Sequence, residues 1–210
     1  GDIFAGHIAK RMGLPIDRLV IATNQNDILH RALSEGDYST GTVTPTAAPS
    51  MDIQVSSNFE RLLFDLSGRD GAALSKMMTD FDKTRSMSIP QDMLTSAGNL
   101  FTSHRVGPDD MALAMRWAHE GAGQVIDPHT AIGLSAAQNA EIDPSIPIVT
   151  LATAHPAKFR DAVERATGVR PALPRRIGDL FDREEAFTKL PGDYDAIKEF
   201  ITENATPANG

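Results

Sequence analysis

Residues 18–27 read RLVIATNQND, a short apolar run that is followed directly by a polar turn. Apolar residues at helical spacing precede this run at 3–12 and follow it at 28–33, and glycines at 13 and 36 mark where each helix should end. The order helix, strand, polar turn, helix is typical of α/β proteins. We therefore predict an α/β fold.

A second apolar run, IPIVTLAT at 146–153, is apolar on both faces, as expected for a central strand of a parallel sheet. The alternation of strands and helices continues at 124–127, a candidate strand that precedes a predicted helix from 128 through 137. Residues 52–55 are a third candidate strand. Ligands of open α/β sheets bind beyond the carboxyl ends of the strands. That edge carries the sequence TAHP at 153–156, so we expect functional residues there.

The rest of the chain is helix-biased. Residues 36–51 predict a long irregular connection, and Ser57 with Glu60 matches a capping box, in which the two side chains satisfy backbone donors at a helix start. Asp70 is a candidate helix cap, and residues 107–110, GPDD, should open another helix. We predict one α/β domain over 1–160 with a helix-rich insertion at about 68–122, and a C-terminal helical tail over 161–210.

Composition excludes several classes of protein. Of 210 residues, 41% are hydrophobic and 23% charged, which is ordinary globular usage, and the net charge of -8 without a basic cluster argues against nucleic acid as a partner. The absence of cysteine removes disulfides, thiolate metal sites and cysteine nucleophiles. Since no histidine pair has metal-ligand spacing and no apolar run would cross a bilayer, we expect no metal, no membrane span and a cytoplasmic location. The first residue is glycine, and we expect a fragment or processed piece.

Several residues are candidates for binding or catalysis. Gly1 and Asp2 stand at a helix start, where free N–H groups favour a phosphate, although an ordinary N-cap explains them equally well. Thr153 ends the second apolar run, where β-branched residues are also common for structural reasons. His129 and His155 each stand at a helix start and could act as acid–base groups or simply pack there.

A further polar cluster, Ser57, Asn58 and Arg61, could face a substrate phosphate, because the guanidinium fork suits phosphate oxygens. Helix capping and solvation explain the same cluster, and the sequence does not decide between these interpretations.

Five blocks together resemble the threonine synthase family and occur in that family's order. They are GDIFAG (1–6), ATNQND (22–27), MDIQVSSNFERLL (51–63), DPHTAIG (127–133) and LATAHPAKF (151–159). The family's phosphate loop reads Gly-Asn-Phe-Gly-Asp, and only its last two residues are present, as Gly1 and Asp2. We therefore expect the C-terminal part of such a protein, with its N-terminal part as the missing partner.

The resemblance implies a fold-type-II pyridoxal 5'-phosphate enzyme with a three-layer, doubly wound, mostly parallel sheet. Such an enzyme converts O-phospho-L-homoserine and water into L-threonine and phosphate, the last step of threonine biosynthesis. The resemblance further implies that Gly1 and Asp2 bind the cofactor phosphate and that the Thr153 hydroxyl contacts the pyridine nitrogen, which a neutral partner leaves largely unprotonated.

The lysine that carries the cofactor is expected upstream, so no catalytic residue is predicted within these 210 residues, and the isolated piece should be inactive. Lys158 lies in the wrong context for that lysine. In the reaction that the resemblance implies, the substrate would lose protons from Cα and Cβ, phosphate would leave from Cγ, and water would add at Cβ.

Three alternatives stay open. A serine or threonine dehydratase or a cysteine synthase would share the sheet but not the blocks at 51–63 and 151–159. A catalytically inactive relative would only bind a ligand. An unrelated phosphate-binding α/β module would not bind the cofactor at all.

Overall fold

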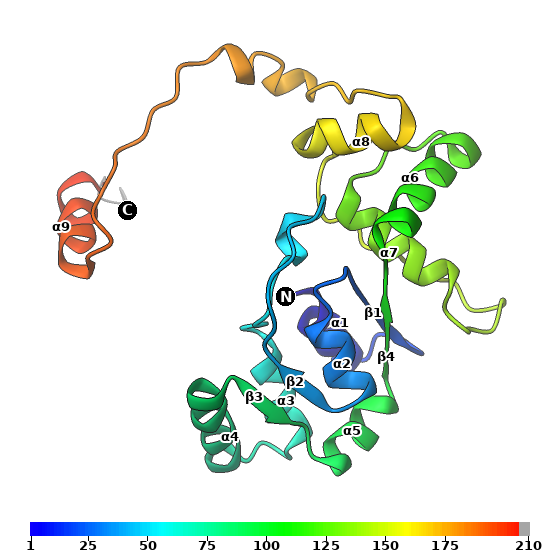
Figure 1. The fold of residues 1–210 in the computed structure, drawn as a ribbon, viewed down its shortest axis with the longest axis vertical. Helices are drawn as coiled ribbons and strands as arrows, with labels where there is room; N and C mark the ends of the chain where they lie inside the picture. Colours follow the sequence, from blue (N-terminus) through cyan, green and yellow to red (C-terminus); the bar gives the residue numbers. More distant parts are fainter. Residues whose placement is uncertain (206–210) are drawn as a thin grey trace. The chain divides into compact units, whose positions relative to one another are not determined.

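The computed structural model describes residues 1–205 and divides the chain into two units, Gly1–Ala172 and Leu173–Gly210. The elements of the first unit follow one another along the chain (Figure 1) as α1 (Asp2–Arg11), β1 (Leu19–Thr23), α2 (Ile28–Ser34), β2 (Asp37–Ser39), η1 (Pro49–Met51), α3 (Phe59–Leu66), α4 (Gly71–Thr84), β3 (Ser86–Ser88), α5 (Gln91–Gly98), β4 (Phe101–Arg105), α6 (Pro108–Ala122), α7 (Pro128–Gln138), η2 (Pro156–Phe159) and α8 (Arg160–Thr167). The predicted mixture of helices and strands is confirmed.

A parallel pair of strands, β1 and β4, forms the centre of the first unit (Figure 1). The register runs from Leu19 opposite Phe101 to Thr23 opposite Arg105, so both strands end at the same edge. Strand β1 was predicted, and helices α1 and α2 flank it as the pattern indicated. Strand β4 lies inside the stretch predicted to be a helix-rich insertion, and that stretch therefore contributes a strand to the same sheet.

A second pair of strands, β2 and β3, is antiparallel, and its Tyr38 packs against aromatic rings of α3 and α4. Tyr38 of β2 is buried, with its ring centroid 5.1 Å from that of Phe59 and 5.0 Å from that of Phe81. Rings at such separations attract each other beyond the gain from burial. Burial of this ring explains how three residues inside the connection predicted to be irregular form a strand.

Helix starts follow the predicted caps in some places and not in others. The Asp70 carboxylate accepts hydrogen bonds from the Ala72 and Ala73 amides at the start of α4, as expected of a cap. The capping box predicted at Ser57 and Glu60 is wrong, because α3 begins after Asn58 and has no side-chain cap. Its first amide, that of Phe59, instead donates to the Ser56 carbonyl at 3.0 Å in a local turn.

Helices α6, α7 and α8 pack together around a smaller core of Met115, Ala131 and Val163. Gly107 and Pro108 open α6 as predicted, and α7 spans the predicted 128–137 helix. The strands predicted at 52–55 and 124–127 are wrong, since neither range forms a ladder.

The strand predicted at 146–153 is also absent from this structure. We call these residues the 146–153 segment. No backbone amide or carbonyl from 148 to 153 has a hydrogen-bond partner among the described residues, and Val149 is 81% exposed. A strand exists only where a neighbour completes its hydrogen bonds, and no described strand lies beside this run.

The second unit is described by itself. It contains η3 (Arg175–Ile177), η4 (Leu180–Asp182) and α9 (Tyr194–Asn204), where Asp193 caps the helix by accepting from the Ala196 amide. The charged helix expected after Tyr194 is confirmed. Within residues 1–205, every helix is too short or too polar to cross a lipid bilayer.

Candidate functional site

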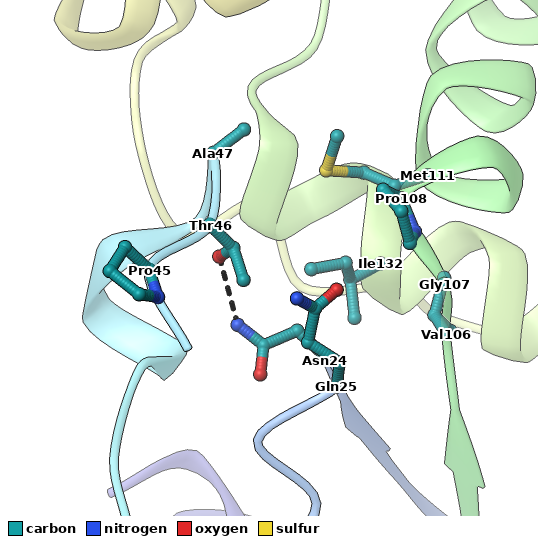
Figure 2. Close-up of a pocket in the computed structure, with 10 residues that line it drawn as sticks. All are labelled: Asn24, Gln25, Pro45, Thr46, Ala47, Val106, Gly107, Pro108, Met111 and Ile132. Carbon is teal, nitrogen blue, oxygen red and sulfur yellow. Dashed lines mark hydrogen bonds between the residues drawn. The ribbon is translucent and has the colours of Figure 1, made fainter. Parts of the chain in front are cut away.

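A pocket of about 300 Å³ opens where β1 and β4 end, the edge at which α/β sheets bind ligands. We call it the strand-end pocket (Figure 2). It is lined by Asn24, Gln25, Pro45, Thr46, Ala47, Val106, Gly107, Pro108, Met111 and Ile132. The N-terminus of α6 and the loop before η1 therefore both contribute to its wall.

A partly buried polar network fixes one side of this pocket. The Asp52 carboxylate accepts from the Asn24 amide at 2.7 Å and the Asn26 amide at 3.0 Å, and from both the backbone N–H and the hydroxyl of Thr46 at 2.7 Å. Asn24 also donates to the Thr46 hydroxyl at 3.0 Å (Figure 2). We call these four residues the Asp52 network.

The Asp52 network ties together two of the sequence blocks quoted above. Asn26 adds two bonds to the backbone of Thr44, at 2.9 and 2.8 Å, so the whole loop from 44 to 52 is held against the end of β1. Because a buried donor without an acceptor is costly, each of these side chains depends on the others. The sequence assigned no role to Asn24, Asn26 or Asp52, and only their clustering after a strand and a Pro-containing loop would have signalled one.

Gln25, unlike Asn24 and Asn26 on either side of it, does not belong to the Asp52 network. Its side-chain amide points into the strand-end pocket (Figure 2) and makes no hydrogen bond to the described residues. The opposite walls are apolar, formed by Val106, Met111 and Ile132. This combination of a free amide and apolar walls suits a small ligand with one polar end.

The two candidate histidines have structural partners. Asp127 caps α7 by accepting from the His129 amide at 2.9 Å, and it is also 2.8 Å from His129 Nδ1. The Ser50 amide donates to His129 Nε2 at 3.3 Å, so the proton is on Nδ1 and both ring nitrogens are engaged. His155 Nδ1 accepts from the Ala157 amide at 3.1 Å and caps η2. Of the two roles considered for these histidines, the structure favours packing and capping at helix starts.

The residues predicted to bind the cofactor lie outside the strand-end pocket lining. Gly1 is the N-cap residue of α1 and has no side-chain cap, and a Cβ built on it would be 3.8 Å from the Asn58 Nδ2. Asp2 is exposed in the first turn of α1, and Thr153 is exposed in the 146–153 segment. Their contact with a cofactor stays a prediction. Lys158 is exposed on η2, with its Nζ 5.9 Å from the centre of the Phe159 ring.

A second hollow, of about 400 Å³, lies between α1 and α3 and includes Arg61 and Asp65 in its lining. The Asp65 side chain is 8% exposed. Burial raises the pKa of Asp65, but hydrogen bonds from Arg11, His7 and Arg69 outweigh it and bring that pKa to about 2. These contacts hold α1 against α3. The described residues contain no group of three or more His, Cys, Asp or Glu side chains placed to hold a metal ion.

Comparisons with protein families and with single proteins point to the same relatives, the threonine synthases. The family model "Threonine synthase, C-terminal" matches residues 130–201. Threonine synthase from Pseudomonas aeruginosa is 46% identical over 205 residues, covering 97% of this chain and 44% of that protein. The same protein from Corynebacterium glutamicum is 39% identical over 209 residues, with the same two coverages.

The solved structures agree with the sequences. The crystal structure of pyridoxal-phosphate-bound threonine synthase from Brucella melitensis superposes with a TM-score of 0.88 at 45% identity, covering 96% of this chain and 43% of that one. The chain therefore spans less than half the length of the relatives that it matches.

Proposed function

We propose that this chain, which is homologous to the C-terminal region of threonine synthases, forms part of an enzyme that converts O-phospho-L-homoserine and water into L-threonine and phosphate. The observation that carries the proposal is the 46% identity to a threonine synthase over 97% of the chain. Because the match covers 44% of that relative, the proposal assigns the remaining machinery, including the cofactor lysine, to an upstream part of the same polypeptide.

The residues at the start of α1 suit the phosphate of pyridoxal 5'-phosphate. Gly1 leaves the first turn without a side-chain cap, so its N–H groups are available to an anion, and the helix dipole favours negative charge there. The Asn58 amide lies beside Gly1 and supplies a further donor. In the proposal, Gly1 and Asp2 hold this phosphate through the backbone.

Thr153 is proposed to contact the pyridine nitrogen of the cofactor. When bound, the cofactor supplies an electron sink for negative charge that develops on the substrate carbons. The Thr153 side chain is exposed and makes no hydrogen bond to the described residues, so its hydroxyl is free for this contact. A hydroxyl remains neutral, which leaves the ring nitrogen largely unprotonated.

The proposal also covers the sheet to which these strands would belong and the place of the reaction in metabolism. The parallel pair β1 and β4 would belong to a three-layer, doubly wound and mostly parallel sheet whose other strands come from upstream. The reaction would be the last step of threonine biosynthesis, in the cytoplasm.

The first test measures phosphate release from O-phospho-L-homoserine by the full-length protein and by a variant that lacks the upstream cofactor lysine. We expect release from the first protein and a loss of at least about 1,000-fold in the second, because the lysine both carries the cofactor and moves protons. Equal rates would contradict the proposed reaction.

The same preparations separate the alternatives. A visible cofactor band without phosphate release indicates a relative that only binds the ligand, and no band indicates an unrelated α/β module. Release of ammonia from serine or threonine indicates a dehydratase.

The second test replaces Thr153 with valine, which keeps the shape of the side chain but removes the hydroxyl. Thr150→Val is the matched control, because a residue three positions away along an extended chain faces the opposite side. We expect Thr153→Val to shift the cofactor absorbance and lower turnover, while Thr150→Val leaves the absorbance unchanged. Identical spectra for the two variants would remove Thr153 from the site.

A further inference from the structure

Helices α1 and α3 lie side by side and contact each other near both ends. At their starts, a Cβ built on Gly1 would lie 3.8 Å from the Asn58 Nδ2. Near their ends, the Asp65 carboxylate lies 3.0 Å from His7 Nε2 and 2.6 Å from Arg11 Nη1. The two contacts are six positions apart on α1 and seven apart on α3, which is about 9 and 10.5 Å along a helix axis. The two helices therefore run in the same direction and are held as a pair.

The polar contact at Asp65, rather than apolar packing, fixes how far one helix can slide along the other. The second hollow, of about 400 Å³, lies between the two helices and is bordered by the apolar side chains of Phe4, Ile8 and Phe64. Side chains that border open space do not interlock, and interlocking is what sets the register of packed helices. The Asp65 side chain is 8% exposed and accepts from three basic residues, so its place is closely determined.

The third donor to Asp65 is held in an unusual backbone conformation. Arg69 has a φ of 69°, in the left-handed region that side chains other than glycine rarely adopt. It keeps this conformation because its amide donates to the Phe64 carbonyl at 2.9 Å and its Nε donates to Asp65 Oδ1 at 3.0 Å. Strained residues of this kind cluster at active sites and ligand clamps. The strain at Arg69 is thus a second indication that Asp65 serves more than helix packing.

Building on the function proposed above, we propose that Asp65 is a positioning residue for the cofactor phosphate. By fixing α1 against α3, it holds the Asn58 amide beside the free N–H groups at the start of α1, so that both helices donate to one anion. Asp65 itself does not touch the phosphate, because its contact lies about 9 Å along α1 from Gly1. A slide of α1 along α3 would separate the two sets of donors, and a misplacement of about 1 Å is enough to weaken such a site.

A comparison of two cofactor forms in the full-length protein tests the proposal. Pyridoxal lacks the phosphate of pyridoxal 5'-phosphate but has the same ring, so its affinity measures the rest of the site. From the absorbance of the bound cofactor, we expect Asp65→Asn to weaken binding of pyridoxal 5'-phosphate on the order of 10-fold and binding of pyridoxal less than about 2-fold. Equal losses for the two forms would show a structural role alone and overturn the proposal, as would unchanged affinity for both.

Asp70→Ala is the matched control, because it removes another hydrogen-bonding carboxylate just beyond the end of α3. Asp70 caps α4 by accepting from the Ala72 and Ala73 amides, and within residues 1–205 it makes no hydrogen bond or ion pair with α1. Its loss lowers helix stability without moving α1, so we expect both affinities to stay within about 2-fold of the original. If Asp70→Ala weakens pyridoxal 5'-phosphate as much as Asp65→Asn does, lost stability explains the effect and the proposal is wrong.

A second pair of variants approaches the same contact from α1 and keeps Asp65 in place. Arg11→Gln removes one donor to Asp65, whereas Lys10→Gln removes the same charge from the same turn, and its side chain donates to the Ile16 carbonyl instead. We expect Arg11→Gln to weaken binding of pyridoxal 5'-phosphate about 3-fold and to move the phosphorus NMR signal of the bound cofactor, and Lys10→Gln to do neither. Both side chains are exposed, so both variants should fold. Identical affinities and phosphorus spectra for the two would overturn the proposal.

Phosphate release from O-phospho-L-homoserine keeps the two proposals apart. An affinity for pyridoxal 5'-phosphate that depends on Asp65, without phosphate release, supports the positioning role and contradicts the proposed reaction. Phosphate release with an affinity that does not depend on Asp65 supports the reaction and overturns the positioning role. A full-length protein that binds neither cofactor form contradicts both proposals.

Discussion

Strand β1 and the 146–153 segment have similar sequences but different structures. Each is a short apolar run that ends in threonine. In β1 every residue from 19 to 23 faces a partner in β4, Ile21 is 5% exposed, and the Asp52 network fixes the residues that follow. Among residues 1–205, the 146–153 segment has neither a partner strand nor such a network. The apolar pattern therefore reports the capacity to form a strand, and the available neighbours decide whether it forms.

The largest expected difference is between matched truncations in the two runs. We expect Ile21→Ala to lower the free energy of unfolding of the 210-residue chain by about 3 kcal/mol, because it removes buried methyl groups and leaves a cavity. Val149→Ala should change it by less than about 0.5 kcal/mol, because the side chain is already in water. Urea unfolding measures both values. Equal losses would mean that the 146–153 segment is as well packed as β1.

The next largest effect tests the Asp52 network, which distinguishes the end of β1 from the end of the segment. We expect Asp52→Ala to cost about 2 kcal/mol, since the amides of Asn24 and Asn26 and the N–H of Thr46 lose their acceptor. Asp82→Ala, at an exposed position, is the control and should change stability by less than about 0.5 kcal/mol. If the two variants unfold at the same urea concentration, the network does not stabilise the loop.

A smaller effect concerns the pH dependence of the contact that Asp65 makes between α3 and α1. Because the pKa of Asp65 is lowered to about 2 from 3.8, its stabilising contribution is complete above pH 3.8 and is lost as the pH falls through 2. We expect the contribution to be roughly 1–2 kcal/mol after allowance for solvent screening of the exposed arginines. Asp65→Asn should therefore be less stable than the original chain at pH 6 and should lose less stability between pH 4 and pH 2. Parallel stability curves for the two proteins would contradict this.

The smallest effect concerns a methyl group beneath the 146–153 segment. Gly133→Ala should stabilise the 210-residue chain by roughly 0.5–1 kcal/mol, because alanine favours the helix and the unpaired Thr150 can move away. Gly121→Ala, whose new methyl group would meet nothing within 4 Å, is the control and should also stabilise the chain. Thermal unfolding of the two variants gives the comparison, and a Gly133→Ala chain that is less stable than the original would mean that Thr150 is fixed in place.

Much of the fold followed from local patterns in the sequence. The apolar run of β1, the cap at Asp70 and the Gly107–Pro108 helix start are each determined by residues close together in the chain, and each was predicted. Strand β4 was not predicted, because its centre reads Thr102, Ser103 and His104 and lacks an apolar pattern. It forms because β1 supplies a parallel neighbour, which is information that no local window contains.

The candidate site was predicted less completely than the fold. The sequence placed functional residues at 153–156, beyond a strand that does not form here, whereas the strand-end pocket lies beyond β1 and β4 and includes Asn24, to which the sequence gave no role. It also gave no role to Asn26 or Asp52. Hydrogen bonds between residues 26 or 28 positions apart cannot be inferred from the spacing of residue types alone. The roles of Gly1, Asp2 and Thr153 came from the family resemblance, and they remain predictions that the cofactor spectra will test.

The bare edges of the 146–153 segment also bear on how the 210-residue chain behaves when it is produced alone. An exposed run of β-branched and aliphatic residues is a template for intermolecular stacking, so concentrated solutions should be prone to aggregate. Pro147 near one end and Pro156 just past the other interrupt such stacking. Only the short stretch between the two prolines can therefore stack. A charged residue at position 149 should therefore improve the solubility of the isolated chain.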